Sequence, residues 1–180
     1  MSIKLTYFVH GTTTDNENNI SSGWKDVDLS APGVKQSKEL IKQINNKKFD
    51  AIFCSDLVRA VHSAGLTFGE NIIIDPRLRE CNYGTYNGQP SEIVEPMQEK
   101  SIEVPFPEGE SYEDVKARIS DFINFLKENY QNKEVAIVAH KAPQLALDVL
   151  LKGWTWEEAF KKDWRKVGKW QPGWEYIIED

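Results

Sequence analysis

Short apolar runs alternate along this chain with longer amphipathic segments, and the alternation narrows the fold more than any other feature. Strands are predicted near residues 3–9, 51–54 and 134–139, with a shorter run at 72–74, and helices near 31–46, 57–68, 111–130 and 142–152. Runs such as 135–139 are typical of parallel strands that are buried on both faces. The sequence therefore predicts an α/β fold with three layers, α/β/α, around a mostly parallel central sheet.

The size and charge of the chain limit how many domains it can form and which kinds of partner it can bind. With 180 residues it can bury a substantial core, and we predict one domain over 1–180. Its 22 basic and 28 acidic residues form no long block of one sign, so we expect no nucleic acid partner and favour small molecules. No stretch has the length of a signal peptide or a membrane span, so we expect a cytoplasmic protein with no membrane partner. Cys54 and Cys81 lack the spacing of a zinc site, and Cys54 is expected in the core.

Two regions fall outside the regular alternation. The connection from Leu78 to Gly109 is rich in glycine and proline and is too long for a simple link, which favours a functional loop. The segment 154–180 holds five of the six tryptophans, namely Trp154, Trp156, Trp164, Trp170 and Trp174. We predict a helix over 155–163, with Thr155 and Glu158 as a capping box, and an edge strand over 174–178. The tryptophans could cover a pocket, form a subunit contact or complete the core.

Two of the three histidines, His10 and His140, stand just after predicted buried strands. In open α/β sheets this edge is where ligands bind. A histidine there can be a metal ligand, a general base, a nucleophile or a packed polar residue. After His10, the small Gly11 would let backbone N–H groups approach an anion, and Thr13 and Asn16 supply neutral donors. This loop therefore favours phosphate.

A second anion site is predicted where the strand at 51–54 ends. Arg59 falls in the first turn of the following helix, with Ser55 or Asp56 as the expected cap. A helix N-terminus and a guanidinium both favour negative charge. The two loops together predict a site for an anionic ligand.

These loops belong to a series of motifs in a fixed order. They are His10-Gly11-x-Thr13 with Asn16, Gly23-Trp24-x-Asp26, Ser55-Asp56-Leu57-x-Arg59-Ala60, Leu78-x-Glu80 with Gly84 and Gly88, Pro107-x-Gly109-Glu110-Ser111, and His140. From residue 5 to about 150 the chain thus resembles the histidine phosphatase superfamily, in its phosphoglycerate mutase-like branch. The resemblance implies phosphoryl transfer through a phosphohistidine on His10. It also implies that His140 and Arg59 stabilise the phosphoryl group and that Glu80 protonates the leaving oxygen.

The resemblance implies an enzyme that needs neither a metal nor a cofactor, and a neutral imidazole is a competent nucleophile without one. We therefore expect a phosphatase that acts on a small phosphorylated metabolite, with phosphoglycerate mutase-type transfer as an alternative. A metal-dependent hydrolase with His10, His140 and Glu80 as ligands is disfavoured, because arginine and backbone donors suit phosphate better than a cation. The oligomeric state stays open.

The chain departs from the family at two positions. Valine stands at position 9, where the family has the arginine of Arg-His-Gly, and valine offers phosphate neither a charge nor a donor. We therefore expect weak turnover, and a pseudoenzyme that binds a phosphorylated ligand or a protein partner is the main rival. With fewer cations nearby, the pKa of His10 should be higher than beside an arginine, so activity should extend toward alkaline pH. Lys141 follows His140 and is predicted to bind the substrate as a replacement point charge.

Overall fold

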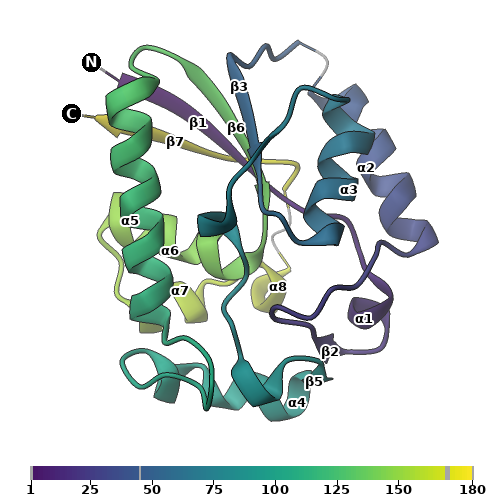
Figure 1. The fold of residues 1–180 in the computed structure, drawn as a ribbon, viewed down its shortest axis with the longest axis vertical. Helices are drawn as coiled ribbons and strands as arrows, with labels where there is room; N and C mark the ends of the chain where they lie inside the picture. The colour runs from purple at the N-terminus through teal and green to yellow at the C-terminus, as the bar shows by residue number, and fades with distance from the viewer. Residues whose placement is uncertain (1, 45, 169–170, 180) are drawn as a thin grey trace.

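The computed structural model describes residues 2–44, 46–168 and 171–179 (Figure 1). Its main sheet has five strands in the order β4-β3-β6-β1-β7. They are β1 (Ser2–Val9), β3 (Ala51–Cys54), β4 (Ile73–Ile74), β6 (Glu134–Ala139) and β7 (Trp174–Glu179). The first four run parallel, and β7 pairs antiparallel with β1 at the edge. The predicted α/β fold with a mostly parallel central sheet is confirmed.

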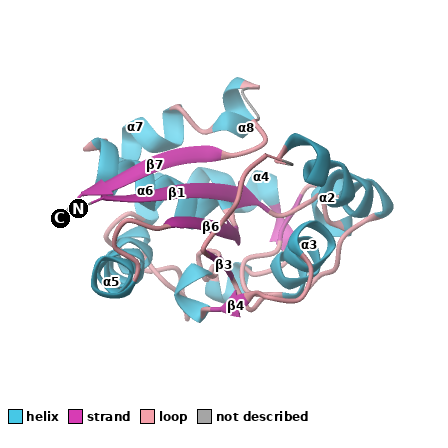
Figure 2. Cartoon of the chain, turned by 90° about the horizontal axis from the view of Figure 1, so that it is seen from above, coloured by secondary structure: helices cyan, strands magenta, loops and turns pink. Residues whose placement is uncertain are grey.

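Two pairs of long helices cover opposite faces of the sheet. Helices α2 (Ala31–Gln43) and α3 (Val58–Phe68) pack together on one face, and α5 (Tyr112–Asn129) and α6 (Lys141–Lys152) pack on the other (Figures 1 and 2). Successive side chains of a strand point to opposite faces of the sheet, so each strand contributes residues to both cores. In β1, Leu5 and Tyr7 join the core under α5 and α6, whereas Phe8 joins the smaller cluster under α2 and α3.

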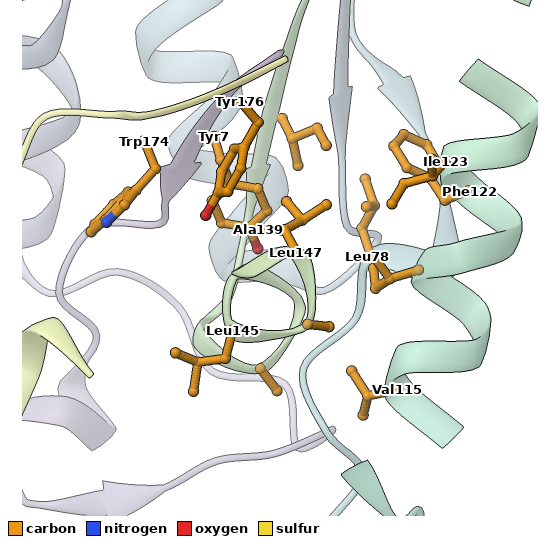
Figure 3. Packing of buried hydrophobic residues seen from close by; sticks show 14 of the residues in the cluster. Tyr7, Leu78, Val115, Phe122, Ile123, Ala139, Leu145, Leu147, Trp174 and Tyr176 are labelled. Carbon is orange, nitrogen blue, oxygen red and sulfur yellow. The ribbon is translucent and has the colours of Figure 1, made fainter. Parts of the chain in front are cut away.

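The larger core lies between the sheet and helices α5 and α6 (Figure 3). Helix α5 begins at Ser111, whose hydroxyl accepts a hydrogen bond from the backbone of Asp114 while the Asp114 side chain accepts from the backbone of Ser111. Val115, Ile119, Phe122 and Leu126 recur at helical spacing and form its apolar stripe, and each is at most 1% exposed. Cys54 is buried in the smaller cluster, also as expected.

The connection after Leu78 folds into short pieces rather than one loop. It contains the 3₁₀ helices η2 (Gly84–Tyr86), η3 (Glu95–Met97) and η4 (Glu99–Ser101), the helix α4 (Ser91–Val94) and the strand β5 (Gln89–Pro90). Strand β5 pairs with β2 (Ile20–Ser21), which follows helix α1 (Thr14–Glu17), and η1 (Pro76–Leu78) precedes the connection. These pieces are gathered at the end of the sheet where the parallel strands finish (Figure 1).

The C-terminal segment returns to the sheet through two short helices, α7 (Trp156–Lys161) and α8 (Trp164–Val167). The capping box of Thr155 and Glu158 forms, and the predicted edge strand is β7. Trp156 and Trp174 complete the core and are at most 8% exposed. Trp164 instead faces the cavity described below, and Trp170 lies outside the described residues.

Candidate active site

The sheet register places the two strand-end histidines side by side. Strands β1 and β6 are neighbours, and Val9 lies opposite Ala139, so His10 and His140 leave the sheet at the same level. The backbone N–H of His10 donates to the carbonyl of Ala139, and the two imidazole rings are 5.1 Å apart between centroids. Both rings lie at the edge where ligands bind in open α/β sheets, as the sequence predicted.

One hydrogen bond fixes the tautomer of His10. Its Nδ1 is 2.7 Å from the carbonyl oxygen of Gly11, which can only accept, so Nδ1 carries the proton and Nε2 keeps its lone pair. Burial, and then the charge of Arg59, lower the pKa of His10 to about 3. The ring is therefore neutral at physiological pH, with Nε2 available as a nucleophile.

His140 is held by a tyrosine on the neighbouring strand. The Tyr7 hydroxyl donates to the His140 carbonyl over 2.6 Å and accepts from the His140 N–H over 3.0 Å. The His140 side chain is fully buried, and neither ring nitrogen has a hydrogen-bond partner among the described residues. Burial, followed by the charge of Arg59, lowers the pKa of His140. Buried polar groups are normally hydrogen-bonded, so a ligand atom that bonded the His140 ring would be favoured.

Arg59 is a buried cation with free donors. It is 2% exposed, and its Nη1 and Nη2 donate to the carbonyls of Lys25 and Gly23 over 3.1 and 2.7 Å. A guanidinium has five N–H donors, so donors remain for an anion in the cavity that Arg59 lines. Its predicted position in the first turn of a helix is correct.

The expected cap of that helix is wrong. Helix α3 begins after Leu57, which makes no side-chain cap, and the N–H of Val58 donates to the Asp26 carboxylate over 3.1 Å. The Ser55 hydroxyl accepts from the N–H of Leu57, and Asp56 forms a bidentate ion pair with Arg79. A carboxylate from a distant loop satisfies the helix end, and local sequence gives no signal for such a partner.

Glu80 is buried beside the start of α6 and is 8% exposed. Its Oε1 accepts from the backbone N–H groups of Cys81 and Ala142 over 2.8 and 3.0 Å. Its backbone carbonyl accepts from the Trp24 indole and from Arg118, which fixes the residue from both sides. Because Oε1 is occupied as an acceptor, Oε2 is the oxygen on which a protonated Glu80 would carry its proton.

The loop after His10 does not form the anion cradle that the sequence suggested. Its N–H groups are already used, since that of Gly11 donates to Ser63 Oγ, that of Thr12 to Gln36 and that of Thr13 to Asn16. Thr13 is fully buried as the N-cap of α1 and does not line the cavity, whereas Asn16 does. A Cβ on Gly11 would lie 2.5 Å from the Gly33 carbonyl, so this glycine allows close packing against α2.

Most of these residues line a cavity of about 700 Å³. The predicted site residues His10, Arg59, Glu80, Gly11, Asn16 and Lys141 line it, whereas His140 lies fully buried behind His10 and Thr13 also stays outside the lining. Val9 also lines it and packs partly against the core. Within the described part of the chain, no three histidine, cysteine, aspartate or glutamate side chains are grouped as metal ligands. That part also contains no helix with the length and apolar character of a membrane span.

Sequence reasoning missed three residues of this site. Tyr7 positions His140, Ser63 bonds the backbone after His10, and Arg165 reaches the cavity from α8. Tyr7 reads as an ordinary strand residue and Ser63 as an ordinary helix residue. Arg165 lies in the tryptophan-rich segment, and no motif near it indicates that its charged side chain reaches the site.

Comparison with known proteins agrees with this geometry. The sequence profile of the histidine phosphatase superfamily (branch 1) matches residues 7–169. Phosphoserine phosphatase 1 of Hydrogenobacter thermophilus is 29% identical over 166 residues, which cover 84% of this chain and 77% of that protein. Fructose-2,6-bisphosphatase TIGAR of Xenopus tropicalis is 35% identical over 135 residues, which cover 68% of this chain and 49% of that protein.

The fold matches as well. The crystal structure of the alpha-ribazole phosphatase from Shigella flexneri superposes with a TM-score of 0.77 at 26% identity, over 88% of this chain and 84% of that chain. A phosphoglycerate mutase from Bacillus anthracis shares the fold with a TM-score of 0.74 at 22% identity, over 84% of this chain and 81% of that chain. The chain belongs to the histidine phosphatase superfamily, branch 1.

Proposed function

We propose that this chain hydrolyses a small phosphate monoester through a phosphohistidine on Nε2 of His10, without a metal ion or an organic cofactor. The observation that carries the proposal is the hydrogen bond from His10 Nδ1 to the Gly11 carbonyl, which leaves the lone pair of Nε2 free on a neutral ring that lines the cavity. Relatives with phosphatase names support hydrolysis as the reaction class.

In the first step, Nε2 of His10 attacks phosphorus and the bond from phosphorus to the ester oxygen breaks. Oε2 of Glu80 gives its proton to that oxygen as the alcohol leaves. Arg59 and His140 hold the equatorial oxygens of the phosphoryl group, where negative charge is spread in the transition state. Gly11, Thr13 and Asn16 were predicted to bind the substrate, and of these we retain Asn16 as a direct ligand through its side-chain amide.

In the second step, water attacks phosphorus and the bond from nitrogen to phosphorus breaks. The Glu80 carboxylate takes a proton from the attacking water, which returns Glu80 to its acid form and His10 to its neutral form. Phosphate and the alcohol are the products, and the proton balance closes without a further reactant. We also place Lys141 among the substrate-binding residues.

The test is phosphate release from a panel of phosphate monoesters with a chelator present. We expect slow turnover in the wild-type chain and none in His10→Ala, while His62→Ala, which changes the half-exposed histidine paired with Asp28, keeps it. Phosphate release that survives in His10→Ala would refute the phosphohistidine. No release from any ester, with phosphate esters still raising the melting temperature, would instead establish the pseudoenzyme. Isomerised phosphoglycerate without released phosphate would establish a mutase.

A further inference from the structure

The peptide group between Gly11 and Thr12 is hydrogen-bonded at both of its ends. Its carbonyl, on Gly11, accepts from Nδ1 of His10 over 2.7 Å. Its N–H, on Thr12, donates to Oε1 of Gln36 over 2.9 Å. A trans peptide group is planar, so its C=O and N–H point in opposite directions and can only turn together. The bond that sets the tautomer of His10 is thus coupled through one rigid unit to a side chain of α2.

The Gln36 side chain presents its oxygen to this loop. Oε1 accepts from the N–H of Thr12 and, over 3.0 Å, from the Thr12 hydroxyl. Because a backbone N–H can only donate, the amide oxygen rather than the amide nitrogen must face it. The loop backbone lies directly on the first turn of α2, where the N–H of Ser30 donates to the Thr12 carbonyl over 2.9 Å. This contact places Gln36, one turn further along α2, within reach of the Thr12 N–H.

The other amides of the loop act on different peptide groups. The N–H of Gly11 donates to Ser63 Oγ over 2.8 Å, and that of Thr13 donates to Asn16 over 3.0 Å. These bonds fix the course of the loop before and after the peptide group that faces His10. The Thr12 N–H is the one that shares a peptide group with the Gly11 carbonyl. Its acceptor, Gln36, therefore acts directly on the orientation of that carbonyl.

The glycine at position 11 gives this restraint its importance. Without a Cβ, the backbone of Gly11 can rotate at low cost, and the peptide group that follows it can turn over. In the inverted group the Thr12 N–H would face Nδ1 of His10, so Nδ1 would have to accept and the ring proton would move to Nε2. The ring would then lose its nucleophilic lone pair. The Gln36 oxygen opposes this inversion, because it attracts the N–H and repels a carbonyl.

We propose that Gln36 is a positioning residue that fixes the tautomer of His10 through the peptide group between Gly11 and Thr12. The inference rests on the proposed function for the role of Nε2 as the nucleophile. The bond to Gln36 also polarises the peptide group, which strengthens the bond that its carbonyl accepts from Nδ1. Gln36 is exposed, so water can satisfy the Thr12 N–H when this side chain is changed, and the fold does not depend on it.

The experiment compares two variants of similar side-chain length. Gln36→Met removes the acceptor, whereas Gln36→Glu keeps an acceptor and cannot donate. Nitrogen NMR of protein with isotope-labelled histidine reports which ring nitrogen of His10 carries the proton at neutral pH, and His10→Ala identifies its signals. We expect the proton on Nδ1 in the wild-type chain and in Gln36→Glu, and a mixture of both tautomers in Gln36→Met. Gln131→Met, in an exposed turn at the other end of the sheet, should keep the wild-type signals.

Kinetics separates this role from a purely structural one. We expect Gln36→Met to lower kcat for ethyl phosphate about 3- to 10-fold, the value of one ordinary hydrogen bond, with little change in KM or in the melting temperature. Gln36→Glu should recover most of the lost kcat. Recovery in Gln36→Glu but not in Gln36→Met would identify the acceptor oxygen as the feature that matters.

A His10 ring that stays protonated on Nδ1 in Gln36→Met would overturn the proposal, and so would the same tautomer mixture in Gln36→Met and Gln36→Glu. The NMR measurement needs no turnover, so both outcomes can be observed even if no ester is hydrolysed. A wild-type ring that carries its proton on Nε2 would instead contradict the tautomer on which the proposed function rests.

Discussion

Position 9 is where a single side chain bears most directly on rate. Val9 lines the cavity beside His10, the proposed nucleophile, and its apolar side chain contributes no charge there. We predict that Val9→Arg raises kcat/KM for ethyl phosphate by about 10²- to 10³-fold, the usual effect of one preorganised electrostatic group. The pKa of His10 should fall further in this variant, because a second cation would disfavour its protonated form.

Steady-state kinetics over a pH series check this prediction, with Val9→Met as the control for side-chain length without charge. An equal gain in Val9→Met would show that size rather than charge matters at this position. An unchanged acidic limb in Val9→Arg would contradict the expected shift in the pKa of His10.

Tyr7 is the residue through which strand β1 positions His140. Tyr7→Phe removes the hydroxyl that bonds both the N–H and the carbonyl of that residue. We expect a loss of about 1–3 kcal/mol in the free energy of unfolding. We also expect kcat to fall about 10- to 100-fold with little change in KM, because in the proposed mechanism the His140 ring holds the phosphoryl group in the transition state. Urea denaturation and kinetics measure the two effects, and Tyr130→Phe should leave both within error.

At the scale of elements, substitutions of two helix glycines test how closely the loop after His10 packs against α2. A Cβ on Gly33, in the first turn of α2, would lie 1.9 Å from the Thr12 carbonyl, whereas a Cβ on Gly65, in α3, meets nothing within 4 Å. We predict that Gly33→Ala destabilises the fold by about 1–3 kcal/mol and lowers activity. Gly65→Ala should stabilise it by about 0.5–1 kcal/mol through helix propensity. Thermal denaturation of both variants measures these changes in stability. A change of the same sign in Gly33→Ala and Gly65→Ala would contradict the prediction.

The elements also show how far sequence reasoning reaches. The run 135–139 and the stripe from Val115 to Leu126 follow from side-chain periodicity, so β6 and α5 were predictable. The cap of α3 by Asp26 was not, because the two residues meet only through the tertiary fold. The same holds for the amides of Gly11 and Thr12, whose acceptors Ser63 and Gln36 lie in α3 and α2. His10, His140 and Arg59 were found from their places at strand ends and at a helix start, whereas Glu80 was found through the resemblance to a known family.

At the scale of the whole molecule, the two histidines of the site make the stability of the fold sensitive to acid. Burial lowers the pKa values of His10 and His140, so both stay neutral in the folded chain while the unfolded chain binds protons below about pH 6.5. Stability should therefore decline as pH falls through this value, by up to about 1.4 kcal/mol per pH unit for each histidine. The stability difference between the wild-type chain and His140→Asn should accordingly change between pH 7 and pH 4.

Chemical denaturation at several pH values measures this difference. His62→Asn serves as the control, because His62 is half-exposed and paired with Asp28 rather than buried in the site. A pH-independent difference for His140→Asn would show that the ring is not held neutral in the folded chain.

The pairing of β1 with β6 and β7 has a consequence for folding kinetics. Tyr7 and the His140 backbone that it bonds are 133 positions apart, and β7 reaches the other edge of β1 from still further along the chain. Strand β1, which leads into the proposed nucleophile His10, thus gains both neighbours only by closing very long loops, which topology makes slow. A newly made chain can form α2, α3 and α5 locally and still lack the pairing that brings His10 and His140 together.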